Sequence, residues 1–367
     1  MTKLRREYHI SRLASLARDD GSKLLSILAI VLAATLAQPV RAQAPEIEIS
    51  GRVQTIFNTT TADSEPRAEW LLRRVRLEAE VTVNDLISGK VQPDFAGGEL
   101  SLKDAYLKLA FTPAFEVLVG RAHRPFSLLE LTSSKRMPPI ERGAAIRGVG
   151  ALEEYELVHG LDYSDRDVGL QVMGAPAGAP LGFEYAVGVF GGPLQGEVGN
   201  ANTYQLAGRA TVQPTEMLKF GLGISNRDFH EVGPGVDETD LTRGNAVEMD
   251  LEYGSFGPGF HLLAEVATGE LDPARGDDFL GAQTWLAYRH ELDNTVVSTI
   301  EPTMRVSYGD ADLHPTVTTA SGGTLLTPGL NLYLGGLNRV MVNYDVWLPA
   351  EDGDAEGSFK AMFQLVF

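Results

Sequence analysis

Arginine side chains and hydroxyl groups gather in one part of the chain, between residues 70 and 147. The residues of this kind that draw attention are Arg73, Arg74, Arg76, Ser133, Ser134, Lys135 and Arg142. A partly dehydrated oxyanion needs several donors at once, and guanidinium forks match its geometry. The stretch therefore suits the binding of a small anion. The alternative is structural, since the arginines could instead pair with Glu78, Glu80 or Glu141 and brace the fold.

Motifs for enzyme chemistry are missing from the sequence. There is no G-x-S-x-G elbow, no P-loop and no H-E-x-x-H metal motif. The histidines that follow the N-terminal region are scattered, and no spacing marks one of them as a catalytic base. We therefore predict that the protein is not an enzyme and needs no cofactor or metal, with a hydrolase built on a Ser–His pair as the minor alternative.

The N-terminus has the three-part layout of a secretory signal peptide. Basic residues lead, an apolar run extends from Leu24 to Ala37, and Val40-Arg41-Ala42 places small residues where a signal peptidase reads them. The apolar run is too short to cross ~30 Å of hydrocarbon, which needs about 20 residues. We predict that residues 1–42 are a cleaved signal peptide and that residues 43–367 form the exported domain.

Composition and charge exclude several classes of protein. The formal net charge is −18 and becomes more negative when the basic signal is removed, so nucleic acid is not an expected partner. The chain has no cysteine, which excludes a disulfide framework. Beyond the signal no apolar run approaches the length of a membrane helix, whereas a membrane β-strand needs only about 9–11 residues.

Apolar and polar residues alternate along most of the predicted exported domain. In residues 74–83 every odd position is apolar and every even position is charged or threonine. The same period recurs in 46–57, 104–111, 167–172, 183–189, 218–225, 247–253 and 340–348. A soluble β-sandwich also alternates, but here the polar face repeatedly carries charges and glycines. We therefore predict a transmembrane antiparallel β-barrel of the bacterial outer membrane, which is an all-β fold with a wet interior.

The connections between the predicted strands alternate in length. Residues 84–86, 112–114 and 213–216 are tight turns, whereas 121–165 is a long loop. Short turns on one rim and long loops on the other are typical of outer-membrane barrels. At about 20 residues for each strand and its connection, the exported domain holds sixteen strands, enough to enclose an aqueous pore. The aromatic residues expected in interfacial girdles are Trp70, Tyr253, Tyr288 and Trp347.

The C-terminus supports the same fold independently. Residues 359–367 alternate between apolar and polar, and the chain ends on Phe367. A last strand that ends in an aromatic residue is the pattern that the barrel-insertion machinery reads. We therefore expect this machinery, outer-membrane lipid and lipopolysaccharide as partners of the chain.

Six short motifs in a fixed order carry a resemblance to a known family. They are Arg73-Arg74-Val75-Arg76, Gln92-Pro93-Asp94-Phe95-Ala96-Gly97-Gly98, Lys103-Asp104-Ala105-Tyr106-Leu107, Arg124-Pro125-Phe126-Ser127-Leu128, Thr132-Ser133-Ser134-Lys135-Arg136 and Ile140-Glu141-Arg142. Together they resemble the phosphate-selective porin O and P family over about residues 66–147. Beyond that stretch the resemblance depends on the strand layout and the terminal phenylalanine.

The resemblance implies a homotrimer of sixteen-stranded channels whose third long loop folds into the lumen and narrows it. Matched by motif, the anion site at this constriction comprises Arg73, Arg74, Asp104, Ser133, Ser134, Lys135 and Arg142. The first two look like the wall arginines of the family, while the serines, the lysine and Arg142 look like loop donors. Asp104 is similar to the family's single aspartate, with Asp94 as its rival.

The resemblance also implies the passive diffusion of small anions, with phosphate or polyphosphate as the solute. The later strands depart from a basic funnel, because they supply few and scattered basic residues, and acidic residues on their polar faces oppose these. These acidic residues are Glu184, Glu248, Asp250, Glu252 and Asp345. A weakly selective general diffusion porin is therefore the main alternative, and an outer-membrane enzyme or adhesin is a more distant one.

Overall fold

The computed structural model describes residues 44–61, 67–144, 148–192, 203–230, 241–273, 276–312, 322–350 and 353–367. One compact unit, Glu46–Phe367, contains all of the regular structure discussed below. The predicted signal peptide, residues 1–42, lies outside the described residues.

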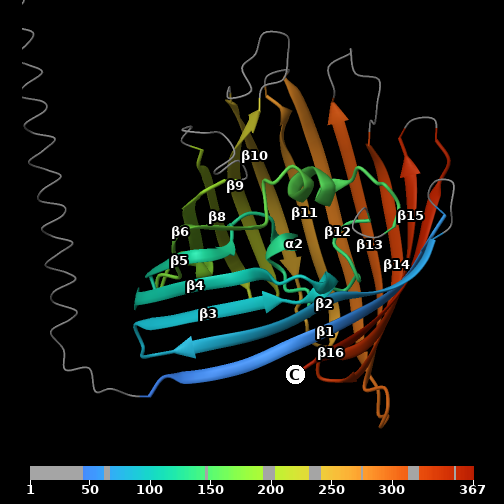
Figure 1. Ribbon diagram of the computed structural model, residues 1–367, viewed down its shortest axis with the longest axis horizontal. Helices are drawn as coiled ribbons and strands as arrows, with labels where there is room; N and C mark the ends of the chain where they lie inside the picture. The colour runs from blue at the N-terminus through green and yellow to red at the C-terminus, as the bar shows by residue number, and fades with distance from the viewer. Residues whose placement is uncertain are drawn as a thin grey trace, which may run out of the picture. The chain divides into compact units, whose positions relative to one another are not determined.

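The described residues form sixteen strands that close into one barrel (Figure 1). In chain order they are β1 (Glu46–Thr60), β2 (Arg67–Thr82), β3 (Ile87–Asp94), β4 (Ser101–Thr112), β5 (Phe115–His123), β6 (Arg166–Gly174), β7 (Glu184–Phe190), β8 (Gln205–Thr215), β9 (Leu218–His230), β10 (Leu241–Tyr253), β11 (Gly259–Asp272), β12 (Asp277–Glu291), β13 (Thr299–Asp312), β14 (Gly322–Gly335), β15 (Asn338–Pro349) and β16 (Glu356–Val366). Each strand pairs antiparallel with the next, and β16 pairs with β1. The predicted fold is therefore confirmed.

Short helical segments interrupt this pattern in three places. They are η1 (Ala96–Gly98), the pair α2 (Leu128–Leu131) and η2 (Glu156–Gly160) between β5 and β6, and η3 (Pro180–Gly182). Within the described ranges no helix is long and apolar enough to cross a membrane.

The barrel wall is apolar outside and polar inside, the reverse of a soluble protein. Outward side chains such as Ile49 and Leu222 are 69% and 54% exposed, whereas inward Gln54 and Asn331 are fully buried. Lipid cannot satisfy a backbone amide, so the strands must pair all round the ring and leave no open edge. Because successive side chains alternate between the two faces, this requirement produces the period seen in the sequence.

At the closing seam of the barrel, Gly51 of β1 lies next to Phe367, which follows β16. Gly51 and Phe367 exchange backbone hydrogen bonds of 2.8 and 3.2 Å across the seam. A side chain at position 51 would lie only 2.6 Å from the ring of Phe367, so the small residue makes room for the ring. The phenyl group itself faces outward and is 58% exposed.

Three of the four predicted girdle aromatics face outward, and the fourth was placed wrongly. Trp70, Tyr253 and Tyr288 are exposed, but Trp347 is buried on the inner face of β15. It packs there in a cluster with Ala144, Val149, Ala151 and Leu325. Three of these partners come from the connection between β5 and β6, which gives an inward tryptophan an apolar environment that the strand alone does not provide.

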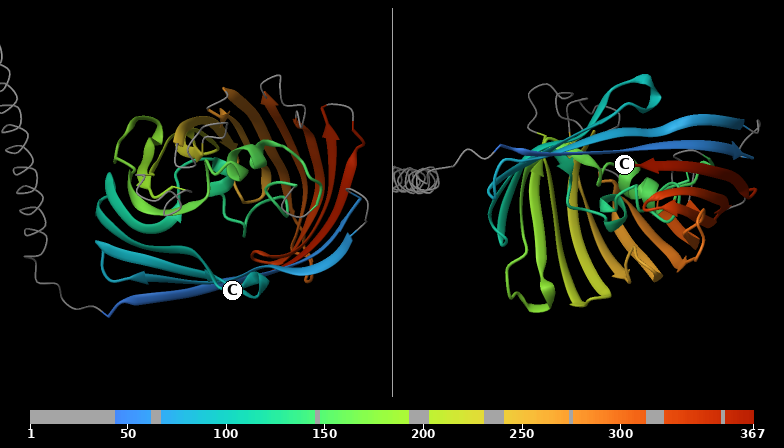
Figure 2. Two further views of the ribbon diagram at one scale, coloured as in Figure 1. Left: turned by 45° about the horizontal axis from the view of Figure 1, so that its top comes forward. Right: turned by 90° about the horizontal axis from the view of Figure 1, so that it is seen from below.

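That connection, residues 124–165, is the third long one along the chain, and we call it the inner loop. It lies inside the ring of strands (Figure 2, left, green). Inward residues of distant strands hold its backbone: Asn331 donates to Pro138 O at 3.0 Å, and Ile140 N donates to Asn343 at 2.7 Å. Wall arginines add further bonds, since Arg305 donates to two carbonyls of the loop. The loop therefore partly fills the interior and narrows it.

Candidate functional site

A cavity of about 270 Å³ lies between the inner loop and the inner faces of the first six strands. We call it the basic recess, because eight basic and four acidic residues line it. The basic ones are Arg52, Arg73, Arg74, Arg76, Lys90, Lys103, Arg142 and Arg166, and the acidic ones are Glu78, Asp104, Glu130 and Asp165. Positive charge therefore exceeds negative charge in a partly enclosed space, which strengthens its effect on an anion.

A β-bulge explains how two consecutive arginines reach the same recess. In the pairing of β1 with β2, Gln54 lies opposite Arg74 and Thr55 lies opposite Leu72. Arg73 is therefore the extra residue of a bulge, and the strict alternation of the strand is broken there. Both Arg73 and Arg74 consequently line the recess instead of pointing to opposite faces.

Arg73 and Arg74 both bind the carboxylate of Glu141 on the inner loop. Arg73 donates from Nε and Nη2, the latter at 3.1 Å, and Arg74 Nη2 lies 3.4 Å away. Burial by itself would raise the pKa of Glu141, but the two guanidinium charges and the hydrogen bonds of Arg73 outweigh it and lower the pKa to about 2. These contacts are the bracing arrangement that stood as the alternative to anion binding, and they tie the loop to the wall.

The remaining predicted loop donors have different surroundings. Arg142 donates to the carbonyls of Leu129, Glu130 and Thr132 at 2.8, 3.1 and 2.5 Å, so it shapes the loop around the recess. Lys135 does not line the recess, and its Nζ lies 3.5 Å from Glu78.

The two predicted serines both line the recess but differ in how free they are. Ser133 is exposed, and its Oγ accepts a 3.4 Å hydrogen bond from the backbone of Lys135. Ser134 is buried, and its Oγ has no hydrogen-bond partner among the residues that the structure describes. Ser134 therefore keeps a hydroxyl donor available in the recess.

The two candidate aspartates are both paired with arginines. Asp104 lines the recess and accepts a 2.6 Å bond from Arg166, whereas Asp94 binds Arg76 at 2.6 Å and does not line it. Asp94 also accepts from two backbone amides, which ties it to the end of β3. The recess thus contains six of the seven predicted residues, and of the two aspartates it contains Asp104.

Four basic residues of the recess were not singled out from the sequence, namely Arg52, Lys90, Lys103 and Arg166, and the first and third of these differ from the others in their surroundings. Arg52 is 4% exposed and Lys103 is half-buried, and within the described part of the chain neither has a hydrogen-bonded or ion-paired partner. Arg52 also lies directly opposite Arg76 in the pairing of β1 with β2. The polar face of β1 is visible in the sequence, but the register that sets one arginine against the other is not.

The opposite side of the lumen is acidic, as the polar faces of the later strands indicate. Glu248 and Glu265 are buried on the inner faces of β10 and β11, and Glu154 of the inner loop is buried with them. Burial, then the charges of Glu265 and Glu153, hold the pKa of Glu154 well above its usual range. Arg209 pairs with Asp250 and Glu248 on this wall. The basic character is therefore local to the recess.

Comparison with known proteins gives one family and one fold. The family model of the phosphate-selective porins O and P matches residues 47–252. No curated protein sequence matches the chain. Solved structures with the same fold include an anion-selective porin from Comamonas acidovorans, with 13% identity, a TM-score of 0.61 and coverage of 88% of this chain and 100% of that one.

Two other solved structures are similar to the same extent. OprB of Pseudomonas putida has 11% identity and a TM-score of 0.60 over 88% of this chain and 94% of its own. A trimer form of OmpT, an outer membrane protein of Vibrio cholerae, has 14% identity and a TM-score of 0.57 over 88% and 100% of the two chains. At these identities the likeness is one of fold.

Proposed function

Since the chain belongs to the family of phosphate-selective porins O and P, we propose that its outer-membrane channel binds phosphate, or an oxyanion of similar shape, in the basic recess as small anions diffuse through. The family and the fold identify a channel of the bacterial outer membrane. The proposal concerns the solute and the residues that contact it.

The observation that carries the proposal is the pair formed by Arg52 and Arg76. Like charges that face each other across two strands destabilise a sheet. Arg76 is balanced by Asp94, but Arg52 is buried in the recess, and no described residue forms a hydrogen bond or an ion pair with it. An uncompensated buried charge is costly, and an oxyanion held between the guanidinium groups would offset that cost.

Other unpaired donors support the same assignment. The ammonium group of Lys103 and the hydroxyl group of Ser134 line the recess with Arg52. Three other arginines already have partners: Arg73 and Arg74 bind Glu141, and Arg142 binds loop carbonyls. They therefore contribute positive potential and a rigid wall, and do not make the direct contacts with the anion. A selective channel must bind its ion weakly enough to release it quickly. A recess in which only a few hydrogen-bond donors are free to contact the anion meets this requirement.

A weakly selective diffusion porin is the second candidate. The observation that favours it is the buried acidic wall formed by Glu154, Glu248 and Glu265. Negative charge there opposes the potential of the basic recess, so we expect a moderate preference for anions instead of an absolute one.

We extend the proposal to the assembly and its surroundings. A homotrimer is the expected state, and the trimer form of OmpT is a precedent of the same fold. We expect export through a signal peptide at residues 1–42. The other expected partners are lipopolysaccharide and the barrel-insertion machinery, which would recognise the last strand through Phe367.

Phosphate titrated against chloride tests the proposed site. Single channels of the purified protein in a planar bilayer should carry a chloride current that falls and then saturates as phosphate is added, because bound phosphate occupies the recess. Sulfate at the same ionic strength should block less strongly if the site prefers phosphate. A current that follows only the bulk conductivity of the solution would remove the binding site and leave the general diffusion porin.

A further inference from the structure

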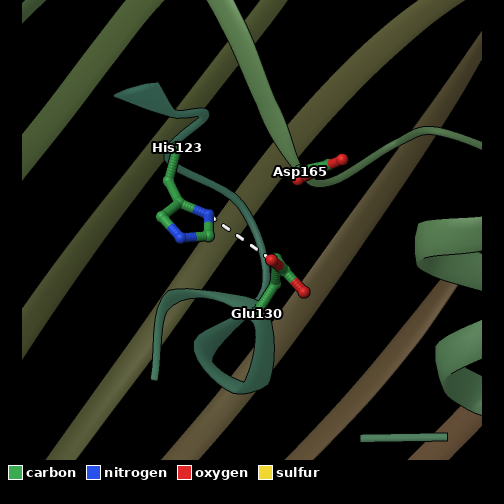
Figure 3. A group of neighbouring side chains, drawn as sticks. All are labelled: His123, Glu130 and Asp165. Atoms are coloured by element: carbon green, nitrogen blue, oxygen red, sulfur yellow. Dashed lines mark ion pairs between the residues drawn. The ribbon is translucent and has the colours of Figure 1, made fainter. Parts of the chain in front are cut away.

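Three potential metal ligands that line the basic recess come from three separate parts of the chain. His123 ends β5, Glu130 lies in α2 and Asp165 precedes β6 (Figure 3). One ligating atom from each lies within 4.8 Å of the others. Figure 3 shows the imidazole of His123 directed at the carboxylate of Glu130, with Asp165 next to both. Sequence spacing gave no indication of this cluster, because only the fold brings the segments together.

The distances in the cluster suit a metal ion better than a direct contact. His123 Nδ1 lies 3.5 Å from Glu130 Oε1, at the outer limit of a hydrogen bond. In a tetrahedral site with bonds of about 2.0–2.1 Å, neighbouring ligand atoms are about 3.4 Å apart. The pair therefore already has the spacing of one edge of such a site, and a carboxylate oxygen of Asp165 lies within 4.8 Å of a ligand atom of each.

A second histidine lies within reach of the same carboxylate. His159 Nδ1 is 3.8 Å from Glu130 Oε2, and its ring stacks on Tyr155 at 4.7 Å between centroids. Tyr155 also donates a 3.1 Å hydrogen bond to Glu130 Oε2, which leaves Oε1 turned towards His123. The Nδ1 atoms of both histidines are buried, and neither has a hydrogen-bond partner in the described ranges of the chain. Oriented ligands with unused lone pairs are what a metal site requires.

Three arginines near the cluster, Arg76, Arg142 and Arg166, would lower its affinity for a cation, but their hydrogen bonds are made elsewhere. Arg76 donates to Asp94 at 2.6 Å. Arg166 donates to Asp104 at 2.6 Å, and Arg142 donates to three carbonyls of the inner loop. Arg142 Nε also lies 3.4 Å from Glu130 Oε2, and a metal ion would have to compete with this ion pair. Two carboxylates and two imidazoles supply the mixed oxygen and nitrogen donors that suit Zn²⁺, Co²⁺ or Ni²⁺ rather than Ca²⁺ or Mg²⁺.

We propose that His123, Glu130 and Asp165, with His159 as the fourth ligand, bind one divalent transition-metal ion such as Zn²⁺. The ion joins the inner loop to the wall at the end of β5 and adds a positive charge at the margin of the basic recess. The metal ligands are not among the proposed anion donors, although both groups line the recess. Metal binding is also measured without an anion substrate, so it is tested separately from the proposed anion site.

Cobalt is the probe for this site, because tetrahedral Co²⁺ with nitrogen and oxygen ligands absorbs visible light. Co²⁺ alone is titrated into the full, detergent-solubilised protein, and Zn²⁺ is then added as a competitor. We expect one saturating Co²⁺ per chain with tetrahedral absorption bands, and displacement by one Zn²⁺. His123→Gln and Asp165→Asn should each weaken Co²⁺ binding at least about tenfold, since each removes a ligand.

The matched control is His261→Gln. His261 also pairs with a glutamate, Glu252, at 2.9 Å on the inner face of the wall, but it lies outside the cluster. This variant should bind Co²⁺ as the wild type does, and heat-modified migration on gels checks that every variant has a closed barrel. The proposal is overturned if the wild type shows no saturable binding, or if His123→Gln and Asp165→Asn in folded barrels bind as tightly as His261→Gln.

Discussion

Replacing Arg52 with glutamine is expected to raise the phosphate concentration that half-blocks the chloride current by about tenfold to a hundredfold. A hydrogen bond to a charged group contributes about 1.5–3 kcal/mol, and each 1.4 kcal/mol is a factor of ten in binding. Arg52 is the buried arginine of the recess that has no partner within the described residues, so its full interaction is available to the anion. The variant also removes the like-charge pair with Arg76, so the barrel should be no less stable.

The control for this prediction is Arg243→Gln. Arg243 lies near the start of β10, pairs with Asp228 at 2.9 Å, and does not line the recess. Loss of this arginine should leave the block by phosphate within about twofold of the wild type, because the charge that is removed lies outside the recess and is screened by salt. Equal effects of the two substitutions would mean that overall charge, and not the recess, sets the block.

Replacing Glu141 with glutamine is expected to release the inner loop from β2 and to destabilise the folded channel by about 3–5 kcal/mol, the usual cost of removing one partner from a buried ion pair. Arg73 and Arg74 would lose the carboxylate that both of them contact. We expect a larger and noisier single-channel conductance, and faster proteolysis within residues 124–165. Thermal unfolding in detergent gives the change in stability.

Acid should reproduce the same release in the wild type. The pKa of Glu141 is lowered to about 2, so its charge favours the folded state at pH values above its ordinary pKa near 4.5. That contribution is lost as the pH falls from about 4.5 through 2, whereas the glutamine variant lacks it at every pH. Conductance should therefore be steady from pH 8 to 5 and change below that range in the wild type alone.

Glu116→Gln is the matched control for both experiments on Glu141. Glu116 pairs with Lys108 at 3.3 Å, but both side chains are partly exposed. Such a pair contributes about 0–1 kcal/mol, so stability, conductance and proteolysis should scarcely change. A similar loss of stability in the two variants would contradict the anchoring role assigned to Glu141.

The fold could be predicted because lipid and water impose a simple rule on every strand. Side chains such as Leu222 must face lipid and neighbours such as Gly221 and Gly223 must face the lumen, so the period of two is repeated along the chain. Trp347 shows where the rule fails. It is apolar but faces inward, because the inner loop covers it, and no local pattern in β15 reports that contact.

The sequence could predict which residues form the site, but not which partners those residues bind. Motif order identified Arg73, Arg74 and Ser134, all of which line the recess. Their partners depend on a bulge at Arg73, on the register that opposes Arg52 to Arg76, and on the path of the inner loop. Each of these is a tertiary feature, because a shift of one residue in register would reverse the faces of a strand.

The reversal potential of the wild-type channel under a tenfold KCl gradient tests the central claim most directly. If the basic recess governs permeation, chloride should pass more readily than potassium. The reversal potential should then have the sign of the chloride equilibrium potential. Added phosphate should reduce the current without reversing that sign. A potential on the potassium side, unchanged when Arg52 is replaced with glutamine, would show that the acidic wall controls the pore and would contradict the account.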